Sequence, residues 1–177
     1  MQQVTDVKPS STLPVSETTF ADLLRPLIDP GFRLALAMLH DAQAAEDAVQ
    51  EASFIAWRKL GRMHDQGRLR PWFLGIVANK CRNARRNKWS AGVTLGVPDV
   101  LPVPSPEERT LRGADLRRAI ARLGYDDRLV VVLYFYVDMP LDELAAVTRS
   151  SAGAARARLY RAINKLRPGV AIEEALR

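Results

Sequence analysis

Apolar residues recur every three or four positions through most of the N-terminal half of the chain, which is the spacing of one face of an α-helix. Residues 20–39 follow this pattern, but Asp29-Pro30-Gly31 is expected to interrupt the helix and divide it into two pieces. A second helix is predicted over residues 45–60 and a third from Pro71 onward, with the polar residues 61–70 between them. The predicted inward faces are Ala45, Val49, Ala52, Ala56 and Leu60 in the second helix and Leu74, Val77, Ala78 and Cys81 in the third.

The C-terminal half continues the helical spacing but contains one ambiguous stretch. A helix is expected to begin at residues 106–108 and to turn one face of residues 116–123 inward. Residues 129–137 form an unbroken apolar run, for which periodicity does not separate a helix from a buried strand. The flanking helices and the lack of a partner strand in the sequence favour a helix, with Asp126 or Asp127 as its N-cap.

The last two predicted helices have the arrangement of a helix-turn-helix. A short helix over residues 140–147 is followed by a turn at 148–150 and by a longer helix from Ser151, its expected N-cap, to Leu166. Residues 149–167 contain six Lys or Arg residues and no acid, which suits contact with the phosphates of DNA. The alternative is an ordinary helical hairpin with a basic face.

Two stretches of different composition indicate an all-α protein with two small helical domains. Residues 1–17 are rich in Ser, Thr, Pro and Gln and are expected to be disordered. Residues 90–106 carry Gly and Pro at positions that break any helix, which is typical of a linker. The predicted division is a tail at 1–17, a first domain at 18–89, the linker at 90–106, a second domain at 107–168 and a short tail at 169–177.

Composition and charge limit the function. The net charge of +6 and the pI near 9.9 indicate an anionic partner. The sequence has no apolar run of the roughly 20 residues that a membrane span needs and no evident signal peptide. A single cysteine, Cys81, fits a reducing cytoplasm. His40 and His64 have no metal-ligand spacing with Cys81, and neither a phosphate loop nor a nucleophile–base pair is evident. We therefore expect a cytoplasmic protein that is not an enzyme and needs no metal or cofactor.

The second predicted helix has an unusual outer face, which mixes carboxylates with two large aromatic side chains. Such a face is either a solvated surface with its aromatic edges tucked into the core or a docking surface for a helix of another protein. Its members are Asp47, Gln50, Glu51, Phe54 and Trp57.

The third helix and the loop before it are strongly basic, because residues 58–88 contain ten Lys or Arg residues against one acid, Asp65. Basic groups bind phosphates, aromatic rings stack on unpaired bases, and Asn can pair with a base edge. The alternative is that the aromatic residues belong to the core and that the charges serve solubility. The candidate nucleic-acid contacts of the helix are Trp72, Phe73, Asn79, Arg82, Asn83 and Arg86.

Residues 47–51, 56–60 and 71–79 together resemble conserved region two of the extracytoplasmic-function (ECF) sigma factors, the small bacterial initiation factors of the sigma family. The resemblance covers about residues 20–88, and the C-terminal helix-turn-helix is similar to region four. It implies a transcription initiation factor that binds core RNA polymerase and directs it to promoter DNA. In this family the outer face of the second helix presses on the clamp helices of the polymerase's largest subunit. The polymerase flap and an anti-sigma factor are further partners that the resemblance implies.

The resemblance also implies which residues meet DNA. The loop at 61–70 and Asn79 match the place where a flipped base of the −10 element is captured, and the last helix would enter the major groove at the −35 element. Gly75 stands where the family commonly has Arg, which removes one expected phosphate contact. The promoter sequence is not readable, because the residues at several reading positions depart from those usual in the family: Arg62, Met63, His64, Arg68, Met139-Pro140 and the alanines at 154 and 155. A stand-alone helix-turn-helix regulator is the alternative function. The implied −10 contacts are Arg62, His64, Arg68, Trp72, Phe73, Asn79, Arg82, Asn83 and Arg86, and the implied −35 contacts are Ser151, Arg156, Ala157, Tyr160 and Arg161.

Overall fold

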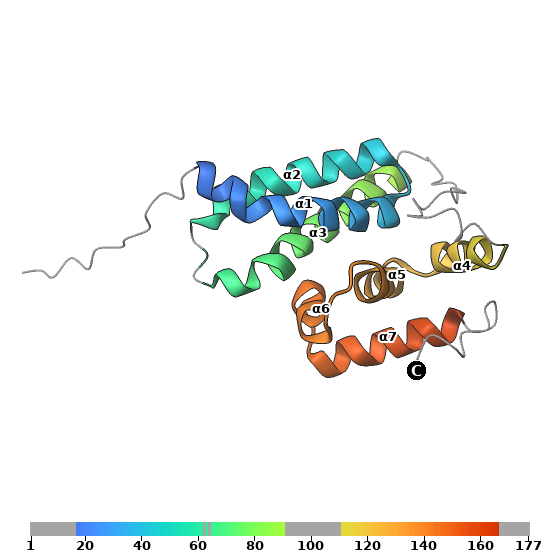
Figure 1. Cartoon of the computed structure of the whole chain (residues 1–177). Coiled ribbons are helices and arrows are strands. Elements are labelled where there is room, and N and C mark those ends of the chain that lie inside the picture. The colour runs from blue at the N-terminus through green and yellow to red at the C-terminus, as the bar shows by residue number, and fades with distance from the viewer. Residues whose placement is uncertain (1–16, 62, 64, 91–110, 167–177) are drawn as a thin grey trace, which may run out of the picture.

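The computed structural model describes residues 17–61, 63, 65–90 and 111–166, and within these ranges it contains helices and turns but no strand. Figure 1 shows the three long helices of the first half side by side, with α5, α6 and α7 beneath them. The prediction of an all-α fold is confirmed. The elements are α1 (Glu17–Leu39), α2 (Ala42–Leu60), the 3-10 turn η1 (Gln66–Arg68), α3 (Leu69–Ser90), α4 (Leu111–Arg122), α5 (Tyr125–Val131), the π-helical turn η3 (Val132–Tyr136), α6 (Leu141–Thr148) and α7 (Ala152–Leu166).

Several predicted features lie outside the described residues. They are the N-terminal tail up to residue 16, the linker from residue 91 to 106, the helix start at 106–108, the C-terminal tail at 169–177, and the two loop residues Arg62 and His64.

Helix α1 is continuous, so the predicted interruption at Asp29-Pro30-Gly31 is wrong. Pro30 lacks the N–H that would bond the carbonyl of Pro26, and such a loss in a helix interior costs about 3 kcal/mol. Burial of the apolar face offsets this cost, because each fully buried Leu or Met side chain stabilises the fold by about 1.5–3 kcal/mol. The buried side chains of α1 include Leu24, Leu27, Leu34, Met38 and Leu39.

Gly31 allows α1 to approach α3 closely. A Cβ atom at this position would lie 3.1 Å from the ring of Phe73, so a larger residue would push the two helices apart. Phe73 is fully buried at this contact. The predicted inward faces of α2 and α3 are confirmed, since all of their members are buried: Ala45, Val49, Ala52, Ala56, Leu60, Leu74, Val77, Ala78 and Cys81.

The apolar run at 129–137 is helical, as the flanking helices indicated, and it begins as α5 and ends as η3. The prediction that Asp126 or Asp127 caps this helix is wrong. Gly124 is the N-cap residue, no side chain caps the helix, and both aspartates lie in its first turn. Their carboxylates pair instead with basic groups on other helices.

The predicted helix-turn-helix is confirmed by α6 and α7. Arg149, in the turn between them, has a left-handed backbone with φ of 52°, and its N–H contacts the last carbonyls of α6. The hydroxyl of Ser151 accepts a hydrogen bond of 3.2 Å from the N–H of Ala154, which caps α7 as expected. The inner face of α7 buries Ala155, Leu159, Ala162, Ile163 and Leu166.

The two halves of the chain pack against each other. Helix α6 lies against α3, and α1 contacts both α5 and η3 (Figure 1). Arg33 of α1 donates to the carbonyl of Tyr136 at 2.9 Å, and its guanidinium lies 4.6 Å from the centre of that ring. Arg70 of α3 pairs with Glu143 of α6 at 2.9 Å and donates to the carbonyl of Val137 at 2.8 Å. These contacts fix the helix-turn-helix beside α3.

Candidate functional site

The acidic and aromatic face of α2 lies at the surface. Phe54 is 62% exposed and Trp57 is 40% exposed, which is unusual for such large apolar side chains. The edge of Trp57 meets the ring of Phe20 at 4.9 Å, so part of its indole is tucked against α1. Phe54 meets only the guanidinium of Arg58, at 5.8 Å, among the ring contacts of the described residues. The face therefore combines a partly anchored and a largely free aromatic ring.

Carboxylates surround these rings. Asp47, Gln50 and Glu51 are all exposed on α2. Glu51 pairs with Lys80 of α3 at 2.6 Å, and Asp47 accepts a hydrogen bond of 3.3 Å from Gln43. Because these contacts are exposed, each contributes only about 0–1 kcal/mol to stability. The basic groups of a partner protein can therefore take the place of Lys80 or Gln43 at little cost.

The outer side of α3 is exposed and basic. Asn79, Arg82, Asn83 and Arg86 all lie on it, and the amide oxygen of Asn83 accepts a hydrogen bond of 3.5 Å from Arg86. In the loop before α3, Arg68 is exposed and pairs with Asp65 at 3.4 Å. This side of the helix presents guanidinium and amide groups to solvent, the groups that meet phosphates and base edges.

The two aromatic candidates of α3 have different environments. Trp72 is half-buried, so part of its indole remains accessible. Phe73 has no exposed surface and packs against Gly31. A ring without exposed surface cannot stack on a base, so we remove Phe73 from the candidate DNA contacts and assign it to the core.

The exposed side of α7 carries every predicted −35 residue. Tyr160 is 58% exposed, and its neighbours on this side are basic or small. The opposite side of the helix is buried against α5 and α6, which leaves the outer side free for a groove of DNA. The exposed residues are Ser151, Arg156, Ala157, Tyr160 and Arg161.

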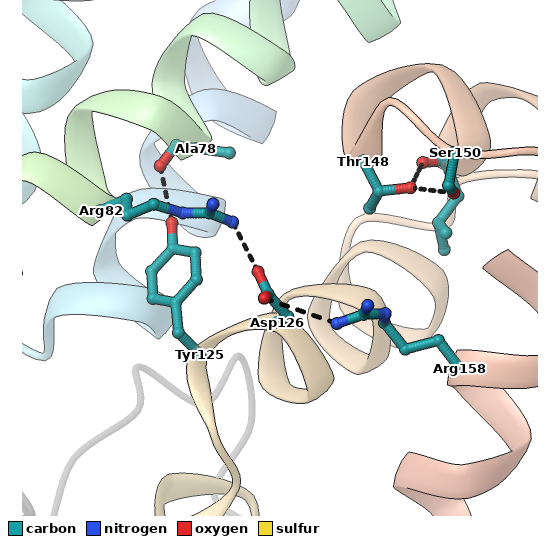
Figure 2. A network of polar contacts seen from close by, with 8 residues as sticks. Ala78, Arg82, Tyr125, Asp126, Thr148, Ser150 and Arg158 are labelled. Carbon is teal, nitrogen blue, oxygen red and sulfur yellow. Dashed lines mark hydrogen bonds and ion pairs between the residues drawn. The ribbon is translucent and has the colours of Figure 1, made fainter. Parts of the chain in front are cut away.

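The sequence did not predict the contacts that join α3 to the C-terminal helices (Figure 2). The carboxylate of Asp126 pairs with Arg82 at 2.5 Å and with Arg158 of α7 at 3.4 Å. The hydroxyl of Tyr125 donates to the carbonyl of Ala78 at 2.6 Å, and the guanidinium of Arg82 lies 4.8 Å from the centre of the Tyr125 ring. Local sequence favours a cap at the acidic first turn of α5, and only the tertiary packing gives its aspartate these partners.

A polar cavity of about 230 Å³ lies beside this network, between α3, α5 and the turn that joins α6 to α7. Guanidinium groups from both halves of the chain line it, together with the amide of Asn79 and the hydroxyls of Thr148 and Ser150, which lie 2.8 Å apart. The three arginines at this cavity are Arg82, Arg149 and Arg158.

The buried titratable groups serve the packing of the helices. Burial, aided by the nearby Arg128 and Arg85, lowers the pKa of His40 to about 4, so its imidazole is neutral near pH 7. It can then accept the 3.1 Å hydrogen bond from Arg128, which also donates to the carbonyls of Ala121 and Leu123. Burial raises the pKa of Cys81 to about 12, so its thiol stays protonated and unreactive.

No cluster of three or more His, Cys, Asp or Glu side chains in the described part of the chain could hold a metal ion. None of the helices within the described ranges has both the length and the apolar character that crossing a bilayer requires.

Comparison with known proteins identifies the two halves. Residues 23–91 match the family model of sigma-70 region 2, and residues 114–166 match that of sigma-70 region 4. The chain is similar in fold to the sigma factor RpoE of Bartonella quintana, solved with the anti-sigma factor NepR. The TM-score is 0.73 at 22% identity, over 88% of this chain and 98% of that one. It is also similar to CnrH, solved with the cytosolic domain of CnrY, with a TM-score of 0.62 at 23% identity, over 86% of this chain and 88% of that one.

Curated relatives give the family. The ECF RNA polymerase sigma factor SigM of Mycobacterium tuberculosis is 31% identical over 150 residues, which cover 79% of this chain and 74% of SigM. The RNA polymerase sigma factor CarQ of Myxococcus xanthus is 31% identical over 73% of this chain and 76% of its own length. The probable sigma factor RfaY of Xanthomonas campestris is 30% identical over 73% of this chain, which spans only 34% of that longer protein. This chain belongs to the extracytoplasmic-function sigma factors of bacterial RNA polymerase.

Proposed function

We propose that this sigma factor binds core RNA polymerase through the outer face of α2 and reads promoter DNA with two separate basic surfaces. The loop at 61–70 and the outer side of α3 open and read the −10 element, and α7 reads the −35 element. The protein confers promoter choice on the polymerase and catalyses no reaction itself. Its proposed place is the cytoplasm, where the polymerase and the promoter are found.

The exposure of Phe54 carries the polymerase part of this proposal. A ring that is 62% exposed beside carboxylates gains free energy when a partner buries it, and such aromatic anchors dominate protein interfaces. Trp57, already held against Phe20, adds a rigid second anchor. The proposed partner surface is the clamp helices of the largest polymerase subunit, whose basic groups would replace Lys80 beside Glu51. The polymerase flap is the proposed contact of the second domain.

Promoter opening is assigned to Asn79 and its basic neighbours. Flipping a base out of the duplex costs a few kcal/mol, so a protein that melts DNA must hold the base and the displaced backbone together. Asn79 offers an amide for the base edge, and Arg82 offers a guanidinium for a nearby phosphate. Trp72, which is half-buried, offers part of an aromatic surface for stacking.

Reading of the −35 element is assigned to the outer side of α7. Arg156 and Arg161 lie on it beside Tyr160, and a recognition helix of this kind fits the major groove. Neither DNA surface needs to bind tightly alone, because the polymerase would hold both at the promoter spacing and raise the effective concentration of each.

An anti-sigma factor belongs to the proposed partners. The two solved structures of similar fold are complexes, one with the anti-sigma factor NepR and the other with the cytosolic domain of CnrY. Such a partner would compete with the polymerase or with DNA for the exposed faces of α2, α3 and α7.

Run-off transcription with purified core polymerase on a library of genomic fragments tests the proposal. The complete chain should yield transcripts from a defined set of promoters only when core polymerase is present. The alternative, a stand-alone helix-turn-helix regulator, predicts instead that the chain alone protects a specific duplex site from nuclease. Protection of that kind, without any binding to core polymerase, would refute the sigma mechanism.

A further inference from the structure

One carboxylate lies between the two proposed DNA-reading surfaces. Asp126 pairs with Arg82 of α3 at 2.5 Å and with Arg158 of α7 at 3.4 Å, as Figure 2 shows. Arg82 is a proposed −10 contact, and Arg158 lies on the helix proposed to read the −35 element. Both arginines thus share one carboxylate while the two halves of the chain are packed together.

The side chains around this carboxylate hold the packed arrangement in place. Tyr125, the residue before Asp126, donates its hydroxyl to the carbonyl of Ala78 on α3 at 2.6 Å. Its ring lies 4.8 Å from the guanidinium of Arg82, which fixes that group against α5. At the other end of the contact, Arg70 pairs with Glu143 at 2.9 Å. The C-terminal half of the chain is therefore attached to α3 at two places, through α5 and through α6.

The space between the two halves is small beside Asn79 and Arg82. The cavity beside Asn79 and Arg82 holds about 230 Å³, the volume of roughly eight water molecules at about 30 Å³ each. The turn at Thr148–Ser150 lines the same cavity as Asn79, so a strand bound at Asn79 would lie directly beside the second domain. Asn79 and Arg82 keep exposed surface, and what the packed arrangement changes is the partner of Arg82, whose guanidinium is held by Asp126.

We propose that Asp126 acts as an internal substitute for a nucleic-acid phosphate and keeps the free protein in a closed state that binds DNA weakly. Carboxylates and phosphates both accept charge-assisted hydrogen bonds from guanidinium groups, so Arg82 cannot serve Asp126 and a phosphate fully at once. If core polymerase holds the two domains apart at the promoter spacing, its binding would remove Asp126 from Arg82 and release the arginine. This inference rests on the proposed function, because it takes Asn79 and Arg82 as DNA contacts.

The variant Asp126→Asn tests the competition, since it keeps the shape of the side chain and removes its charge. Binding is measured by fluorescence anisotropy with a labelled, mixed-sequence single-stranded DNA and the complete free chain. We expect affinity to rise about three- to tenfold, because two exposed ion pairs are lost and each is worth up to about fivefold. Asp142→Asn is the matched control. It makes the same charge change at an exposed position in the first turn of α6, where no ion pair within the described residues involves it. It should change affinity less than twofold.

A distance measurement tests the closed state independently of DNA. Cysteines introduced at the exposed positions Glu46 of α2 and Asn164 of α7 can be spin-labelled selectively, because the native Cys81 is fully buried. We expect one narrow distance distribution in the parent protein and a broader, longer one with Asp126→Asn. Circular dichroism, with an unchanged helix content, establishes that the variant is folded.

The outcomes separate this inference from the proposed function. If Asp126→Asn leaves both the affinity and the distance distribution like those of Asp142→Asn, while Arg82→Ala still weakens DNA binding, the competition is refuted and the −10 assignment survives. If Arg82→Ala changes neither DNA binding nor transcription with core polymerase, the −10 assignment of Arg82 fails and this inference fails with it.

Discussion

Truncation of Phe54 to alanine should weaken binding to core polymerase without unfolding the protein. A buried Phe side chain removes about 150–250 Å² of surface from water, and 62% of Phe54 is exposed in the free chain. About 90–150 Å² is therefore left for a partner to cover. At about 25 cal/mol per Å², and with allowance for the methyl group that Ala keeps, the loss is about 2–3 kcal/mol. The dissociation constant should rise about 30- to 150-fold.

The measurement is an equilibrium titration of labelled protein with core polymerase, together with a thermal melt of each variant. Ile28→Ala is the matched control, because Ile28 is an apolar residue, 38% exposed, that belongs to α1 and not to the proposed docking face. The control should bind polymerase within about twofold of the parent protein. If Phe54→Ala also binds within twofold while the melting temperature is unchanged, the face of α2 is not the polymerase contact and the reasoning from its exposure is wrong.

Three further predictions concern the DNA surfaces and the buried histidine. Asn79→Ala should keep polymerase affinity but lose promoter opening, measured by permanganate reactivity of unpaired thymines, because it removes only the proposed base contact; normal opening would contradict the assignment. Arg161→Ala should weaken transcription from −35-dependent promoters by about 1–3 kcal/mol if the residue reads a base, while a promoter lacking that element should respond equally to parent and variant. The pKa of His40 is about 4 in the folded chain against 6.5 in the unfolded one, so its share of stability is complete above pH 6.5 and is lost as the pH falls toward 4. Denaturant titrations should show this loss, and it should be absent in His40→Asn, which tolerates the left-handed backbone at this position with its φ of 56°.

The sequence predicted the helices whose faces are set by local spacing. The inward residues predicted for α2 and α3 follow a helical period, and the structure buries all of them. The turn around Arg149 and the cap at Ser151 also follow from short-range chemistry. These features could be read from the chain because each depends on residues within a few positions of one another.

The errors arose where distant residues override local preference. Pro30 predicts a break, but the contacts of α1 with α3, close-packed at Gly31, keep the helix continuous. Phe73 is an aromatic residue of the kind that can stack on a DNA base, but its ring is buried in the core at that same contact. The local preference against a helix costs a few kcal/mol at such positions, and the free energy gained by burying the apolar face of a helix is larger.

The sequence by itself determined the all-α fold, the helix-turn-helix and which residue types lie on each outer face, because periodicity and capping act over one or two turns. Only the tertiary structure decided that α6 and α7 pack on α3, and that Asp126, which caps nothing, joins Arg82 to Arg158. Residues 82 and 126 are 44 positions apart in the chain, and no local pattern encodes their meeting. The pairing exists because the apolar faces of the two halves bury each other, and burial does not depend on direction or on distance along the chain.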